Sequence, residues 1–206
     1  RRLVDISGSV FGYAGQTSRF GGMATFTDCA KFRGGAAIRL AQGSLSVTVS
    51  MRNVSDVDGP FQAMLLGSTK ATFTLQDSTR WSGNSGQYVF QEAVDSSATI
   101  ERADDFSGDA FYWLGHGAGP GLAVRVSDVR RWSGNAARAS LPYGKQSSLA
   151  IDRAVDMSGF SLSSLGSDSN ATSVAISDCR HSRNARSTLS RCLRSRLTRR
   201  PMVIVP

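Results

Sequence analysis

A short motif recurs along the chain at an almost constant interval. The motif is an apolar residue followed by Ser-Gly. Clear or loose copies begin at Ile6, Phe32, Val54, Trp81, Phe106, Trp132, Met157 and His181. The intervals between them are 26, 22, 27, 25, 26, 25 and 24 residues, with a mean of 25. A fixed period of this length is typical of solenoids and other arrays, in which each repeat buries its apolar face against the next.

Strand-like segments flank each motif. An alternating run precedes it, as in 45–49, 71–75 and 122–126, and such two-residue alternation predicts a half-buried strand. A second short run follows, as in 88–90 and 111–114. Two strands and two turns in about 25 residues predict one coil of a solenoid. We therefore expect an all-β fold, a parallel β-helix of about eight rungs over residues 1–184.

Charged residues fall into columns when the copies are aligned. The position four before the motif reads Arg2, Asp28, Ser50, Asp77, Arg102, Asp128, Arg153 and Ser177. The position one before it reads Asp5, Lys31, Asn53, Arg80, Asp105, Arg131, Asp156 and Arg180. The two positions are opposite in charge in six copies and both neutral in a seventh, and each column alternates in sign from the fourth copy to the seventh. Since stacked strands lie about 4.8 Å apart, alternation turns repulsion within a column into attraction and helps to fix the register.

The alternation also defines a unit of two rungs, about 50 residues long. A β-propeller blade has a similar length and four strands, so a propeller is the alternative fold. An antiparallel blade gives no reason for its two halves to match column by column, whereas stacked parallel coils do. The β-helix is therefore the preferred prediction.

The net charge of +8 comes from the end of the sequence. Residues 1–178 hold sixteen Lys/Arg and sixteen Asp/Glu, so we expect no nucleic-acid partner for them. Residues 179–206 hold eight Arg and no acid. We expect 185–206 to form a basic, disordered tail, and its candidates for polyanion binding are Arg191, Arg194, Arg196, Arg199 and Arg200. The preferred interpretation of this tail is a degenerate gene end.

Neither the cysteines nor the acidic residues form a recognisable site. The three cysteines, at 29, 179 and 192, have neither metal-ligand spacing nor the even number of a disulfide framework. Asp77, Asp104, Asp105 and Asp128 each lie one repeat from an arginine. This spacing predicts ion-pair ladders, not the free carboxylates of a calcium-dependent polysaccharide lyase.

Two further segments superficially suggest ligand sites. The spacing of Asp56 and Asp58 resembles that of two ligands in a calcium-binding loop. The other ligands of such a loop are absent from the segment, so a turn is predicted. The glycine-rich segment 115–121 lacks the Lys-Ser/Thr ending of a phosphate loop and is predicted to be a surface turn. His116, within it, has no Ser or Cys partner at a recognisable spacing. We expect no catalytic residue, no cofactor and no metal.

Two sequons are candidates for glycosylation. They begin at Asn53 and Asn170, and they matter if the chain enters the secretory pathway. No apolar segment reaches the roughly 18 to 20 residues of a membrane span, and no signal peptide is recognisable. The opening residues 1–5 look like the middle of a repeat, so we expect a fragment of a longer protein.

The repeats resemble the dispersed gene family surface proteins of trypanosomes. The resemblance lies in Val/Ser/Gly-rich runs that end in Asp-x-x-Arg-Trp-Ser-Gly-Asn, at 77–84 and 128–135, and in Asp-Cys pairs at 28–29 and 178–179. It implies glycosylated surface proteins with β-helical ectodomains, membrane spans elsewhere in a longer chain and no defined catalytic residues. The expected location is the cell surface or the secretory pathway.

Three functions follow from these patterns. The first is non-enzymatic adhesion to glycans or proteins of a host or matrix, through neutral faces rich in Ser, Thr and Asn. The second is a carbohydrate-active enzyme, a polysaccharide lyase or hydrolase, on the same fold. The third is polyanion binding through the arginine-rich tail.

Overall fold

The chain folds as a parallel β-solenoid. The structure is a computed structural model, and it describes residues 6–7, 13–14, 21–33, 39–59, 63–83, 85–86, 88–136, 139–141, 143–158 and 170–178. Every pairing between its described strands is parallel. The predicted all-β parallel fold is confirmed, and the antiparallel propeller alternative is wrong. Within these residues no helix has the length and apolar character of a membrane span.

The described residues form seventeen strands. They are β1 Ile6–Ser7, β2 Tyr13–Ala14, β3 Gly22–Thr27, β4 Phe32–Arg33, β5 Arg39–Leu40, β6 Val47–Arg52, β7 Val57–Asp58, β8 Ala63–Met64, β9 Thr72–Ser82, β10 Tyr88–Val89, β11 Ser97–Phe106, β12 Trp113–Leu114, β13 Ala123–Trp132, β14 Ala139–Ser140, β15 Ser148–Asp152, β16 Asp156–Met157 and β17 Ser173–Ser177.

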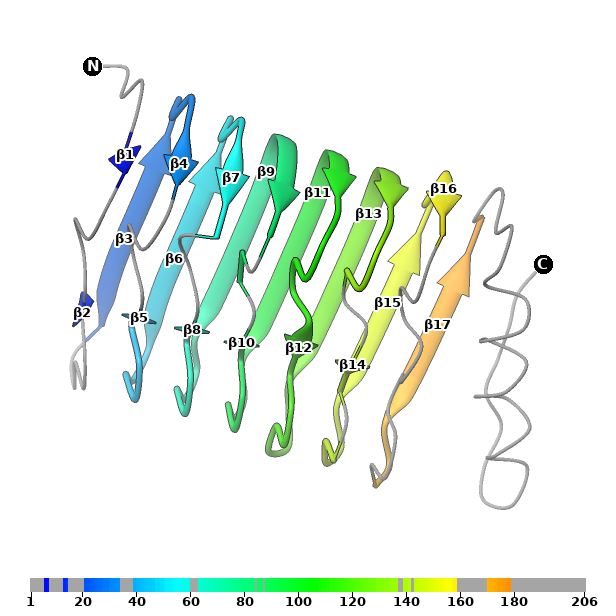
Figure 1. Cartoon of the computed structure of the whole chain (residues 1–206). Helices are drawn as coiled ribbons and strands as arrows, with labels where there is room; N and C mark the ends of the chain where they lie inside the picture. Colours follow the sequence, from blue (N-terminus) through cyan, green and yellow to red (C-terminus); the bar gives the residue numbers. More distant parts are fainter. Residues whose placement is uncertain are drawn as a thin grey trace.

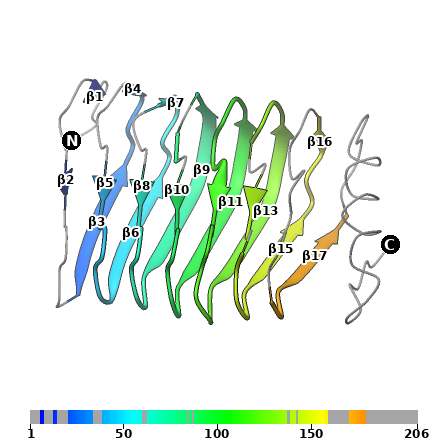
Figure 2. The same cartoon turned by 60° about the horizontal axis from the view of Figure 1, so that its bottom comes forward.

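Each turn of the solenoid has three sides (Figures 1 and 2). The long face contains β3, β6, the first halves of β9, β11 and β13, and then β15 and β17. The short face contains β1, β4, β7, the ends of β9, β11 and β13, and β16. A second sheet is formed by β2, β5, β8, β10, β12 and β14. Five turns have all their strands among the described residues, with partial turns at both ends, so about five complete turns are seen where about eight were expected.

A corner column separates the long face from the short face. It consists of Asp28, Asn53, Asp77, Arg102, Asp128, Arg153 and Asp178, and all of them have φ between 49° and 56°. Asn and Asp accept this left-handed conformation more readily than other residues with a Cβ atom. The corner bends β9, β11 and β13 in their middle, which gives each turn its sharp change of direction. The position four before the repeated motif is therefore a backbone corner.

Two assignments of the predicted columns are wrong. The structure aligns Val57, not Val54, with Phe32 and Trp81. Val54 is also buried, but it lies three residues earlier in the coil, at the position of Cys29, which is a buried free thiol. The register of β15 with β17 pairs Asp152 with Ser177, so the corner residue of the last turn is Asp178, not Ser177.

The corrected register makes the charge pattern more regular than expected. With Val57 as the aligned residue, the third copy carries Asp56 one position before it and Asn53 at the corner. The column one before the motif then alternates over its described part, through Lys31, Asp56, Arg80, Asp105, Arg131 and Asp156.

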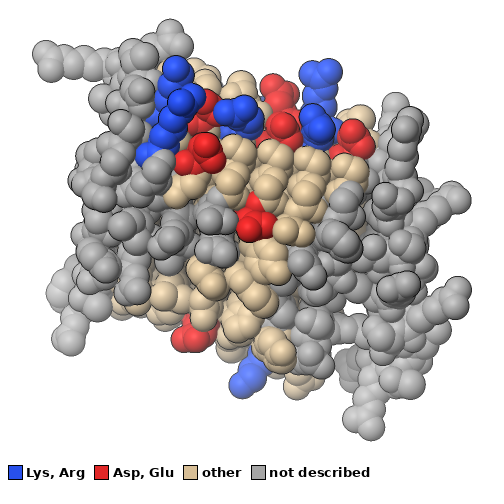
Figure 3. Space-filling view, in the orientation of Figure 1, with Lys and Arg blue, Asp and Glu red and all other residues tan. Residues whose placement is uncertain are grey.

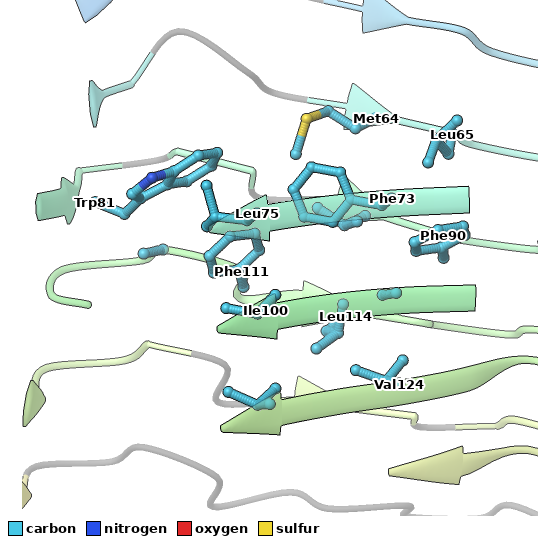
Figure 4. Packing of buried hydrophobic residues seen from close by; sticks show 14 of the residues in the cluster. Met64, Leu65, Phe73, Leu75, Trp81, Phe90, Ile100, Phe111, Leu114 and Val124 are labelled. Atoms are coloured by element: carbon cyan, nitrogen blue, oxygen red, sulfur yellow. The ribbon is translucent and has the colours of Figure 1, made fainter. Parts of the chain in front are cut away.

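Apolar columns fill the interior of the solenoid (Figure 4). Trp81, Phe106 and Trp132 are paired in register, each is at most 1 % exposed, and Met157 follows them in the same backbone register. Phe111, which lies just before β12 on the following coil, stacks on Trp81, with ring centroids 4.9 Å apart. The predicted interior column is therefore confirmed.

The glycine of the Ser-Gly motif has a steric cause. Gly83, Gly108 and Gly134 follow the interior column, with φ of 62°, 62° and 67°. A Cβ atom on Gly108 would lie 2.9 Å from the backbone nitrogen of Gly83. Successive turns approach so closely here that a side chain would collide with the preceding backbone.

Candidate functional site

The long face presents hydroxyl groups to the outside. Apolar residues point inward along each of its strands, so the intervening residues point outward. Two outward columns run across seven strands, and nine of their fourteen positions carry Ser or Thr. These residues, here called the hydroxyl array, are Thr25, Thr48, Ser50, Thr72, Thr74, Ser97, Thr99, Ser148 and Ser173. The array is densest on β6, β9 and β11, and Ala123 and Arg125 interrupt it on β13.

Ion pairs between turns occupy the corner column. The Arg102 Nε donates to Oδ1 of Asp77 over 2.6 Å. Arg153 binds Asp128 through both of its oxygens, over 2.6 Å from Nε and 2.8 Å from Nη2. Each arginine lies 25 residues after its aspartate, as the ladder prediction requires.

Asp56 joins three turns. It accepts hydrogen bonds from Arg33 Nη2 over 3.0 Å and from Arg80 Nε over 2.8 Å. Partial burial tends to raise the pKa of Asp56, but the hydrogen bonds and positive charges of the two arginines outweigh it and hold the pKa below its usual value. The carboxylate is therefore ionised at neutral pH and engaged on both sides.

The two corner aspartates are affected in the same way. Hydrogen bonds from Arg102 lower the pKa of Asp77, and hydrogen bonds from Arg153 lower the pKa of Asp128. The ladder is not continuous, since a buried oxygen of Asp105 has no hydrogen-bond partner among the described residues although Asp105 lies in register with Arg80 and Arg131. The carboxylates of Asp56, Asp77 and Asp128 are thus structural partners of arginines.

The charges are concentrated in one band. In Figure 3, acidic and basic side chains alternate along the upper edge, where Figure 1 has the short face, and the area below this edge is mostly uncharged among the described residues. The band follows the columns of alternating sign. Within the described residues, the ion pairs between turns that involve the column one before the motif are those of Asp56 with Arg33 and Arg80.

The sequons differ in their surroundings. The side-chain amide of Asn53 donates to Asp28 over 2.6 Å, so this nitrogen is already engaged. Asn170 is exposed, as Asn53 is, and its backbone pairs with the preceding coil beside Lys145. The described difference between the two acceptors is therefore the engaged amide nitrogen of Asn53. The arginines proposed to bind polyanions, 191, 194, 196, 199 and 200, lie outside the described residues.

Aromatic rings that are exposed or half-buried gather beside the glycine-rich segment. Segment 115–121 forms turns after β12, where the ring of His116 contacts Trp113 and Tyr143, at centroid distances of 4.9 Å and 5.5 Å. Tyr112 lies 5.1 Å from Trp113. Tyr88 precedes Trp113 in register on the outward side of the second sheet. These five residues are called the aromatic platform below.

The sequence patterns do not indicate the aromatic platform. They place Tyr112 and Trp113 only in a second strand, and they consider His116 only for a catalytic role, which they reject because it has no Ser or Cys partner at a recognisable spacing. A usable signal is nevertheless present, because Phe111 and Leu114 are the buried residues of this segment and leave the two rings between them on the outside.

Comparison with known proteins does not add a relative. No family model, curated protein or solved structure matches the chain. A function must therefore be inferred from the residues themselves.

Proposed function

We propose that the chain is a non-enzymatic adhesive segment of a surface protein, which binds glycans or proteins through its outward faces. The hydroxyl array carries this proposal. It offers donors and acceptors at the spacings of a sheet, about 4.8 Å between strands and about 6.6 Å between alternate residues. A repeating surface of this kind suits a repeating or extended ligand.

The ion pairs of three aspartates favour a binding function over a catalytic one. A lyase or hydrolase on this fold needs a carboxylate that can bind calcium or exchange a proton. Asp56, Asp77 and Asp128 instead have lowered pKa values and form ion pairs with arginines. The resemblance to trypanosomal surface proteins supports the same role and a location at the cell surface.

The test is adhesion of beads coated with the protein to immobilised neutral oligosaccharides, heparan sulfate and laminin. Thr74→Lys places a charge in the middle of the array. The next turn but one carries Arg125 in the same column, so the fold accepts a basic side chain there. Val155→Lys is the matched control, because Val155 is 46 % exposed and lies outside the long face.

We expect the wild type to adhere to at least one of these surfaces and Thr74→Lys to reduce that adhesion several-fold, while Val155→Lys retains it. Equal adhesion of both variants would contradict a role for the array. Release of unsaturated products from polygalacturonate with Ca²⁺ would support the enzymatic alternative instead. Retention of all heparan sulfate binding after removal of residues 180–206 would exclude the tail as its site.

A further inference from the structure

Apart from Phe26, which packs against the core from β3, the aromatic rings that are described as not buried lie in one place. Phe32, Phe73, Phe90, Phe106, Phe111, Trp81 and Trp132 are at most 1 % exposed and belong to the interior. Trp113, His116, Tyr88 and Tyr112 are half-buried, and Tyr143 is 55 % exposed. The platform therefore spans β10, β12 and the turn after β14 on three successive coils of the second sheet (Figure 1).

The rings meet mainly edge to face. The interplanar angles are 65° between Tyr112 and Trp113, 87° between Trp113 and His116, and 72° between His116 and Tyr143. Such contacts fix the rings against one another. The platform is thus held in place, and Tyr143, at 55 % exposed, is its most accessible ring.

We propose that the aromatic platform binds a neutral linear polysaccharide, with pyranose units packed on the rings of Trp113 and Tyr143 and the edge-on ring of His116 between them. This inference rests on the proposed adhesive function and specifies its ligand. The C–H bonds on one side of a pyranose ring form an apolar surface that packs against an aromatic face. The centroid distances of 5.1, 4.9 and 5.5 Å are those of rings in edge contact, so these four rings form one continuous patch.

Polar groups at the platform suit sugar hydroxyls. Tyr, Trp and His each combine an apolar body with a hydrogen-bonding group at its edge. Glu92 lies at the same turn, since a Cβ atom on Gly117 would be 3.7 Å from its Cγ, and Gln91 adjoins it. A carboxylate beside the rings accepts hydrogen bonds from a neutral glycan, and because it balances the charge of Lys145 on the coil that follows segment 115–121, this segment has no excess of positive charge to attract a sulfated or uronic acid chain.

A protein partner fits the platform less well. Protein interfaces combine aromatic residues with apolar neighbours in a desolvated core. The other large apolar residues that are exposed in the described chain are Met23, Leu45 and Val155, and Met23 lies on the long face, away from the platform. The aromatic platform is therefore an isolated group of amphipathic rings, which favours a sugar.

Tryptophan fluorescence provides a direct measurement. Trp81 and Trp132 are at most 1 % exposed, so a ligand-dependent change reports Trp113. The probes are cellohexaose and mannohexaose as neutral chains, and a heparin hexasaccharide as a polyanion. Saturation-transfer NMR measures the same binding independently of Trp113.

The variants are Trp113→Ala, Trp113→Phe and Tyr143→Ala, with Met23→Ala as a control at an exposed apolar residue on the long face. We expect a neutral hexasaccharide to bind, and both alanine variants of the platform to weaken it about tenfold, the effect of about 1.4 kcal/mol. Trp113→Phe keeps a ring and should lose less. Met23→Ala should bind as the wild type does, and circular dichroism checks that each variant is folded.

Two results would overturn the inference. One is equal affinity of the wild type and the folded platform variants, and the other is no binding of either neutral hexasaccharide. Adhesion that is lost in Thr74→Lys but kept in Trp113→Ala would leave the proposed function standing and reject the platform as its site. Absence of adhesion to every immobilised probe would count against the proposed function itself.

Discussion

Single residues in this solenoid are constrained by the neighbouring turns more than by their own sequence neighbours. Gly108 shows this at the backbone, because its Cα faces the backbone of Gly83 one turn earlier. Asp128 shows it at the surface, because its partner Arg153 lies 25 residues later. A substitution at either position therefore acts between turns.

Replacement of Gly108 by alanine should destabilise the fold strongly. Its φ of 62° alone costs about 1–2 kcal/mol for a residue with a Cβ, and the new atom would also lie 2.9 Å from the nitrogen of Gly83. Gly67→Ala is the matched control, since Gly67 has a φ of 61° and no atom within 4 Å of the added Cβ. In urea denaturation, we expect the free energy of unfolding to fall further for Gly108→Ala than for Gly67→Ala. Equal losses would show that close approach of the turns is not the reason for this glycine.

Stability should decline at acid pH because of the paired aspartates. The folded-state pKa values of Asp56, Asp77 and Asp128 lie below the ordinary value of about 3.9. A lowered folded pKa contributes stability above the unfolded pKa, and this contribution is lost as the pH falls through the folded pKa. We expect these groups to contribute constant stability from about pH 7 to pH 5 and progressively less below about pH 4.

The variant Asp128→Asn tests this dependence in a series of urea melts from pH 7 to pH 2. It should be less stable than the wild type at pH 7, with a difference that narrows at low pH. The loss at pH 7 should stay within about 1 kcal/mol, because the pair is exposed. Asp58→Asn is the control, as Asp58 forms no ion pair among the described residues. An unchanged difference across the whole pH range would contradict the role given to Asp128.

At the scale of elements, the corner column couples each strand of the long face to the next. Its charged residues alternate in sign from Asp77 through Arg102, Asp128 and Arg153 to Asp178. The electrostatic influence extends past the nearest partner, because Arg102 also lowers the pKa of Asp128 and Asp178 also raises that of Arg153. These directions favour the interpretation that the column as a whole, and not the isolated pair, stabilises the fold.

Exchange of one pair separates these two interpretations. The double variant Asp128→Arg/Arg153→Asp restores an opposite pair, but it places the new arginine beside Arg102 and the new aspartate beside Asp178. If only pairs mattered, the exchange would restore the wild-type stability lost in each single variant. We expect incomplete recovery in thermal melts, by an amount that shrinks at high salt as the outer repulsions are screened. Full recovery at low salt would show that the alternation beyond the pair has no energetic effect.

The sequence predicts the elements well where the repeat is strict. Trp81, Phe106 and Trp132 identify an interior column, since a buried aromatic at constant spacing has few other structural explanations. The third copy is misaligned because Val54-Ser55 imitates the motif, whereas Val57-Asp58-Gly59 has the glycine of the motif, with a φ of 72°. The left-handed corner at Arg102 and Arg153 was not predictable, because arginine carries no preference for it and the neighbouring turns impose it. The aromatic platform was missed because its rings come from three coils and meet only after folding.

At the scale of the whole molecule, the solenoid is a one-dimensional stack with a charge period of two turns. Stability in such a stack is close to a sum over turns and the interfaces between them. Removal of a complete turn should thus preserve the fold if the columns remain in register. The charge columns respond differently to the deletion of one turn and of two turns. Deletion of one turn places like charges next to each other within a column, whereas deletion of two turns keeps opposite charges adjacent.

Excision of residues 82–106 removes one turn of 25 residues and joins Trp81 to Ser107. Asp77 then lies next to Asp128, and Arg80 next to Arg131, so both columns contain adjacent like charges. Excision of 82–132 removes 51 residues and joins Trp81 to Ser133, which places Asp77 next to Arg153 and Arg80 next to Asp156.

Since the two deletions also remove different amounts of core, their absolute stabilities are not a clean comparison. The salt dependence of the melting temperature is a clean comparison, because salt screens repulsion between turns in the one-turn deletion and attraction between turns in the two-turn deletion. We expect added NaCl to raise the melting temperature of the one-turn deletion relative to that of the two-turn deletion, and an equal response of both would show that the two-turn charge period does not stabilise the stack.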